Sequence, residues 1–206
     1  MPKMKKWMLN DEWLSECRNS ELKEFIQGKF SIEDPVYVNN SENALQIDLT
    51  RYYFFRKRIS VAVQVFKDLL GDGDFLFCEY GSIGLSDLKR YVIGRPNKIN
   101  CIEYQTANPD IEYSYSNISY VRVSGNRFRF RKYARDVLFR KNFANSYYFI
   151  DLDRQRVVRM YDDRGMDILC DKELRKTLYE KYCNIISYFY RKDIQKSIYG
   201  DENKKE

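Results

Sequence analysis

Short runs in which apolar and polar residues alternate predict strands along much of the chain. The clearest run lies at 44–49, ALQIDL, where leucine and isoleucine alternate with glutamine and aspartate. Runs rich in aromatic and β-branched residues occur at 75–80, 100–105 and 118–123, and such residues favour strands. We expect these runs to pair in one sheet that is mostly antiparallel.

The densest strand signal runs from 147 to 169, YYFIDLDRQRVVRMYDDRGMDIL. Two polar stretches, 153–156 and 162–165, divide it into three apolar runs. The first stretch has the length of a hairpin loop. The second begins with aspartate and ends with glycine, as type I turns commonly do. This part of the sequence therefore predicts a three-stranded meander.

Three amphipathic patterns predict helices that cover one face of the sheet. In 52–70, apolar residues recur at intervals of three and four and form one stripe. Gly71 follows this stripe and is placed to cap the helix in the left-handed conformation. Similar stripes occur at 127–143 and, after the N-capping residue Asp171, at 172–198.

Together these elements predict an α+β fold. We expect a sheet of five to seven strands, covered by helices and ending in the meander and a long C-terminal helix. A chain of 206 residues is long enough for one domain with a sizeable core. We assign 1–200 to that domain, with a helical N-terminal part at 1–30, and 201–206 to a disordered tail.

Composition restricts the classes of function. The chain has no histidine, which removes the usual component of Ser-His-Asp triads, Cys-His pairs and most zinc sites. Its five cysteines show no CxxC spacing, so we expect buried, reduced thiols in a cytoplasmic protein. We find no secretory signal, membrane-spanning run or cofactor motif. The net charge of +6 permits a nucleic-acid partner without requiring one, and the 18 tyrosines suit interfaces.

The segment 127–143 is the most basic part of the chain. Its candidate binding residues are Arg127, Arg129, Arg131, Lys132 and Arg135. Two interpretations stay open. These cations form a face that contacts nucleic-acid phosphates or an acidic partner, or they form a solvated helix face that nearby carboxylates neutralise.

The second polar stretch of the meander is the other candidate site. It contains Asp162, Asp163 and Arg164 and is followed closely by Asp167. Carboxylates can hold Mg²⁺, and an arginine beside them can bind phosphate. We favour a structural interpretation, in which Asp162 accepts backbone N–H bonds, Arg164 pairs with Asp163 or Asp167, and Gly165 has a positive φ. We assign no catalytic or metal-binding residue.

Residues 147–182 resemble the C-terminal signature of a bacterial family catalogued only as a domain of unknown function. That signature consists of a YFID strand, here 148–151, a YDDRGxD turn, here 161–167, and a following helix. A weaker likeness extends over 45–80. Some members of the family resemble immunity proteins that neutralise a toxin, so the resemblance implies a binding role and no activity. The Arg-rich segment 127–135 and the five cysteines depart from the family pattern.

The sequence therefore favours a non-catalytic cytoplasmic protein that acts through protein–protein contacts. Its sharpest form is a toxin-neutralising immunity protein with a cognate toxin as partner. Because the chain is positively charged, we expect an acidic partner, or one that is bound through a local acidic patch. The alternative is a basic nucleic-acid-binding module, and the third hypothesis is a Mg²⁺-dependent enzyme that uses Asp162, Asp163 and Asp167.

Overall fold

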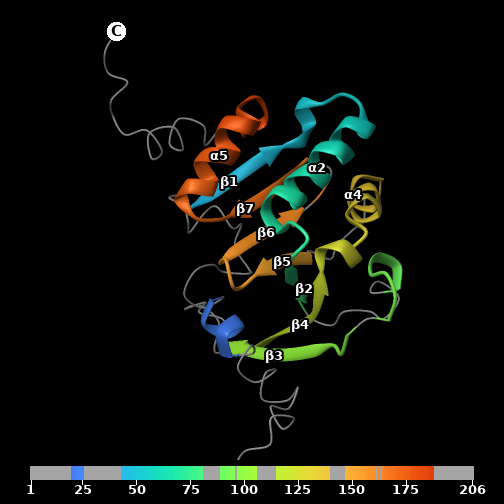
Figure 1. Ribbon diagram of the computed structural model, residues 1–206, viewed down its shortest axis with the longest axis vertical. Helices are drawn as coiled ribbons and strands as arrows, with labels where there is room; N and C mark the ends of the chain where they lie inside the picture. The colour runs from blue at the N-terminus through green and yellow to red at the C-terminus, as the bar shows by residue number, and fades with distance from the viewer. Residues whose placement is uncertain are drawn as a thin grey trace, which may run out of the picture.

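The computed structural model describes residues 20–25, 43–80, 89–95, 97–105, 115–139, 147–160, 162 and 164–187. At its centre, seven strands form an antiparallel sheet in the order β1-β7-β6-β5-β2-β4-β3 (Figure 1). The strands are β1 (Ala44–Asp48), β2 (Asp74–Tyr80), β3 (Asn100–Gln105), β4 (Tyr115–Ser124), β5 (Tyr147–Asp151), β6 (Arg156–Met160) and β7 (Gly165–Leu169). The named helices are η1 (Leu49–Arg51), α2 (Phe55–Leu70), η2 (Gly125–Arg127), α4 (Phe130–Phe139), α5 (Lys172–Tyr182) and η3 (Cys183–Ile185). Residues 20–25 and 89–91 are also helical. The α+β fold expected from the sequence is confirmed.

The predicted meander, β5-β6-β7, lies in the middle of the sheet. Strand β1 extends it on one side by pairing with β7, and β2 extends it on the other by pairing with β5. Side chains alternate between the two faces, as the two-residue period requires. Tyr148 and Phe149 are neighbours in β5, and they belong to the two different hydrophobic cores of the protein.

The larger core lies between the sheet and helices α2, α4 and α5. Phe149 is at its centre, with ring centroids 4.8 Å from Phe66 of α2 and 5.0 Å from Tyr133 of α4. The smaller core, on the opposite face, includes Leu22 and Phe25 of the helical segment 20–25. The three predicted helices thus share one face of the sheet, as expected.

Helix α2 ends at Leu70, but the predicted left-handed cap at Gly71 is wrong. Gly71 has φ 61° and ψ −146°, a combination that is open essentially to glycine alone. Its N–H donates to the carbonyl oxygen of Lys67 at 2.9 Å. The chain therefore reverses sharply here and enters β2 within three residues.

Helix α4 begins at Phe130, three residues later than predicted. The preceding residues instead bond with the segment 91–93. The N–H of Ile93 donates to the carbonyl of Arg127, and the N–H of Arg129 donates to the carbonyl of Tyr91, each at 2.8 Å. These bonds hold Phe128 extended between η2 and α4, as a bridge partner of Val92, which the apolar spacing of the sequence does not reveal.

Helix α5 begins after Asp171, whose carboxylate accepts a bond from the N–H of Leu174 at 2.8 Å, as predicted. The predicted extension to 198 is wrong, because α5 ends at Tyr182. After η3, Ile186 forms an antiparallel bridge with Ile47, and Ser187 N–H donates to Gln46. The N–H of Ile186 still donates to the carbonyl of Tyr182, and the edge of β1 takes the next bond, from Ser187. The remainder of the expected helix, 188–198, lies outside the described residues, as do most of 1–30 and the tail 201–206.

Candidate functional site

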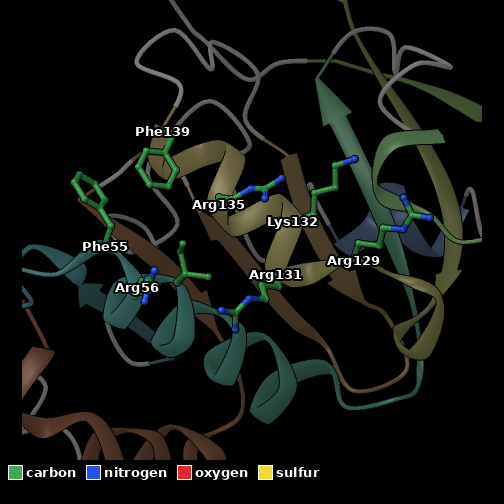
Figure 2. Close-up of a pocket in the computed structure, with 8 residues that line it drawn as sticks. Phe55, Arg56, Arg129, Arg131, Lys132, Arg135 and Phe139 are labelled. Atoms are coloured by element: carbon green, nitrogen blue, oxygen red, sulfur yellow. The ribbon is translucent and has the colours of Figure 1, made fainter.

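Helices α2 and α4 pack in opposite directions, and a groove of about 680 Å³ lies along their seam (Figure 2). Two ring contacts fix this arrangement. Phe66 of α2 stacks on Phe130 at the start of α4, with centroids 5.1 Å apart. Phe55 at the start of α2 packs on Phe139 at the end of α4, with centroids 5.0 Å apart. The groove is lined by Phe55, Arg56, Ile59, Arg129, Arg131, Lys132, Arg135 and Phe139.

Five of these lining side chains are cationic and none is acidic. Within the described part of the chain, Asp136 is the one carboxylate within 4.0 Å of any of them, at 3.8 Å from Arg135. Asp136 is much closer to Arg90, at 2.6 Å, so it does little to neutralise the groove. The interpretation of this face as cations neutralised by nearby carboxylates is therefore not supported by the described ion pairs.

The cations also oppose the helix dipoles. Arg56 lies in the first turn of α2, and Arg131 and Lys132 lie in the first turn of α4; neither turn contains an acidic residue. The amino end of a helix carries partial positive charge, so cations are unfavourable there by about 0.3–1 kcal/mol each. Helix stability therefore does not explain why Arg56, Arg131 and Lys132 occupy these positions.

One end of the groove is aromatic. The ring of Phe55 is covered in part by Phe139 and in part by the guanidinium of Arg58, whose Cζ is 5.1 Å from the ring centroid. Arg58 is itself held in place, because its Nε donates to the carbonyl oxygen of Tyr52 at 2.7 Å. The side chain of Phe139 remains 59% exposed. This end of the groove is therefore a preformed apolar surface open to solvent.

A second hollow, of about 590 Å³, adjoins the aromatic end and shares Phe55 and Arg56 with the groove. The neighbouring side chains Tyr53 and Phe54 are 87% and 72% exposed. Exposed aromatic residues next to cations commonly mark interaction surfaces. The surface that combines cations with exposed aromatic side chains therefore extends beyond the groove to Tyr53 and Phe54.

The inner side of α4 is anchored by the hydrogen-bonded carboxylate of Asp136 and by the buried ring of Tyr133. Asp136 accepts bonds from Arg90 Nε at 2.6 Å and from the Tyr91 hydroxyl at 3.3 Å. Tyr133 is fully buried, and this burial raises its pKa well above the usual range, so its hydroxyl stays neutral. These contacts hold the inner side of α4 in place, and the outer side of α4 lines the groove.

The structure divides the predicted basic residues into two groups. Arg129, Arg131, Lys132 and Arg135 line the groove. Arg127 does not, because its Nε and Nη2 donate to the carbonyl oxygens of Ile93 and Arg95 at 3.1 and 2.8 Å. It therefore clamps the 93–95 segment and lies outside the groove.

Sequence reasoning missed four residues that complete the groove, namely Phe55, Arg56, Ile59 and Phe139. The run RYYFFRKR at 51–58 offered a signal, since four consecutive aromatic residues cannot all lie on one buried helix stripe. The contact between Phe55 and Phe139 joins two distant segments, so no local pattern predicts it.

The acidic turn has a structural arrangement. Asp162 accepts bonds from the N–H and the Nε of Arg164, both at 2.7 Å, and its carboxylate lies 2.6 Å from Arg164 Nη2. The carbonyl of Arg164 in turn accepts the N–H of Leu49 at 2.7 Å. The prediction that Asp162 braces the turn is confirmed. Arg164 pairs with Asp162, a partner that we did not predict, and the predicted partner Asp163 lies outside the described residues.

Two further details of the turn differ from expectation. Gly165 begins β7, and the glycines of positive φ in the described segments are Gly71 and Gly94, so the predicted positive φ at Gly165 is wrong. The side chain of Asp167 is buried and accepts a bond from Gln46 Nε2 at 3.3 Å. Burial raises the pKa of Asp167 to about 6. Among the described residues, no three His, Cys, Asp or Glu side chains gather closely enough to hold a metal ion.

Comparison with known proteins places the chain in a family. The family model described as "Domain of unknown function (DUF3885)" matches residues 19–189. The chain belongs to the DUF3885 family. This match includes every described residue of the groove and of the acidic turn. No match was found among the curated proteins or among the solved structures.

The chemistry of this DUF3885 domain offers little nucleophilic reactivity in its cores. Burial raises the pKa of the Cys170 thiol to about 12 and that of Cys78 even further. Both thiols therefore stay protonated at neutral pH. Among the described helices, none is both long and apolar enough to cross a membrane. Among the described residues, the α2–α4 groove combines cations with exposed aromatic side chains.

Proposed function

We propose that this DUF3885 protein is a non-catalytic binding protein that holds an acidic protein partner in the α2–α4 groove. The observation that supports the proposal is a groove lined by five cations and no carboxylate. Placing like charges together in this way is unfavourable until an anion binds. An acidic partner supplies that anion, which accords with the positive charge of the whole chain.

Toxin neutralisation is the finer form of the proposal. The family resemblance of the meander suggests an immunity-type role, and a toxin with an acidic contact surface fits the groove. We place this binding in the cytoplasm, where free thiols such as Cys78 and Cys170 stay reduced. A bacterial host follows from the same resemblance.

The test uses a defined acidic probe. A fluorescent peptide of alternating glutamate and serine is titrated with the wild-type protein and with the double variant Arg131→Glu/Arg135→Glu. The variant should bind at least about tenfold more weakly, because both cations face the probe. The matched control is Lys172→Glu/Lys176→Glu on the exposed side of α5, which changes the net charge equally and should bind like the wild type.

Single-stranded oligothymidylate serves as the second probe. The exposed rings of Tyr53 and Phe54 favour nucleic acid as the alternative partner, since bases stack on exposed aromatic side chains. If oligothymidylate binds more tightly than the peptide at physiological salt, the partner is a nucleic acid and not an acidic protein. Equal peptide affinity of the groove variant and the α5 control would overturn the proposal itself.

A further inference from the structure

We infer that the groove recognises an acidic polypeptide segment that carries one bulky apolar side chain, seated against Phe55 and Phe139. This inference rests on the proposed function and names the partner's chemistry. The two ends of the groove differ in chemistry, because one is aromatic and the other is basic. Figure 2 shows Phe55 and Phe139 together at one end, while Arg129 lies at the other.

The apolar end is shaped before any partner arrives. Phe139 packs on Phe55, and Arg58 contacts the same ring from α2 while its Nε is bound to the carbonyl of Tyr52. Ile59, which is buried, also lines this groove. A preformed seat costs little conformational entropy on binding, and apolar surface removed from water contributes roughly 25 cal/mol per Å². One aromatic or long aliphatic side chain of the partner gains most from this site.

The basic part of the groove sets the charge around that anchor. Arg131 and Arg135 are one helical turn apart on α4, so their side chains leave the same face roughly 5–6 Å apart. Arg56 approaches from α2 across the seam. Each guanidinium can accept a carboxylate with two parallel hydrogen bonds. The matching segment therefore carries several carboxylates next to its apolar residue.

A polypeptide fits these features better than a nucleic-acid strand does. In a single-stranded nucleic acid, successive bases stack on exposed aromatic rings that are spaced along the groove that binds the phosphates. In this groove the rings are gathered at one end, and Phe55 is already covered in part by Phe139 and Arg58. The arrangement suits one anchor side chain flanked by charge, the usual organisation of protein hot spots.

The experiment compares two peptides of equal charge by fluorescence anisotropy. Both are glutamate-rich, and one contains a tryptophan where the other contains a serine. The wild-type protein should prefer the tryptophan peptide by about tenfold. Phe139→Ala should lose this preference while still binding the serine peptide, and Phe139→Leu should retain most of it. Because Phe139 is largely exposed, both variants should fold, which circular dichroism checks.

The outcomes separate the two proposals. Equal affinity of the wild type for both peptides, with weaker binding by Arg131→Glu/Arg135→Glu, overturns the anchor and leaves the acidic partner in place. Unchanged binding of both peptides by the charge variant overturns the groove as the binding site. Tighter binding of a matched oligothymidylate than of either peptide assigns the groove to nucleic acid and overturns the inference.

Discussion

The carboxylate of Asp136 lies 2.6 Å from Nε of Arg90, although 46 positions separate the two residues in the chain. This ion pair ties the inner side of α4 to the helical segment 89–91. The Tyr91 hydroxyl adds a second bond to the same carboxylate. Because α4 supplies half of the residues that line the groove, the pair fixes the binding face from behind.

Replacing Asp136 by asparagine should therefore lower both stability and groove binding. The carboxylate is nearly buried while Arg90 is partly exposed, so we expect a loss of about 1–2 kcal/mol in the free energy of unfolding. Urea denaturation measures it. The control is Arg122→Ala, which breaks an exposed pair with Asp74 and should cost less than about 1 kcal/mol. Equal losses in the two variants would contradict the special role of the Arg90–Asp136 pair.

Arg131→Glu should stabilise the fold while it weakens binding. The change places a negative charge in the first turn of α4 and removes repulsion from Arg135 one turn away. We expect a gain of about 0.3–1 kcal/mol in the free energy of unfolding, measured by thermal or urea denaturation. A clear loss of stability would show instead that Arg131 serves the fold.

Asp167 should make stability depend on pH. Burial raises its pKa in the folded protein to about 6, above the ordinary value of 3.8, so the folded state holds this proton more tightly than the unfolded chain does. The resulting stability is complete below about pH 4 and is lost as pH rises through about 6. Asp167→Asn should therefore stabilise the protein at pH 8, by on the order of 1–3 kcal/mol, and change little at pH 4. An equal difference in stability between the wild type and Asp167→Asn at pH 8 and pH 4 would contradict this prediction.

Mutation of the acidic turn should lower the stability of the fold, and Mg²⁺ should not change that stability. Asp162→Ala removes the bonds to the N–H and guanidinium of Arg164, and we expect a loss of about 1 kcal/mol in the free energy of unfolding. Binding of acidic peptides in the α2–α4 groove should persist. The loss should be the same in Mg²⁺ and in EDTA. Stabilisation of the wild type by Mg²⁺, absent from Asp162→Ala, would point to a metal site at this turn.

Much of the fold could be predicted because local patterns and tertiary packing agree. The alternation in β1 matches a strand with one face in the larger core, and the apolar runs of the meander match strands whose faces belong to two cores. Where long-range bonds compete with local periodicity, prediction fails. Ile186 leaves the expected helix because the edge of β1 at Ile47 offers it a partner, and no helical spacing encodes that pairing.

The candidate site was predicted in part for the same reason. A basic run on one helix is visible in the sequence, so Arg129, Arg131, Lys132 and Arg135 could be found. Arg127 belongs to the same run but bonds to the carbonyls of 93 and 95, which only the folded chain brings near. Phe55 and Phe139 meet through helix packing, so their contact had no sequence signature, although the aromatic run at 51–58 was visible.

The groove is tested most directly by mapping a bound acidic peptide on the protein by NMR. The glutamate-rich tryptophan peptide is titrated into the ¹⁵N-labelled protein, and amide shifts are followed residue by residue. We predict the largest changes at Phe55, Arg56, Arg131, Arg135 and Phe139, with little change at Asp162 or along β3. Shifts concentrated at the acidic turn or on β3, with the α2–α4 seam unaffected, would contradict the account.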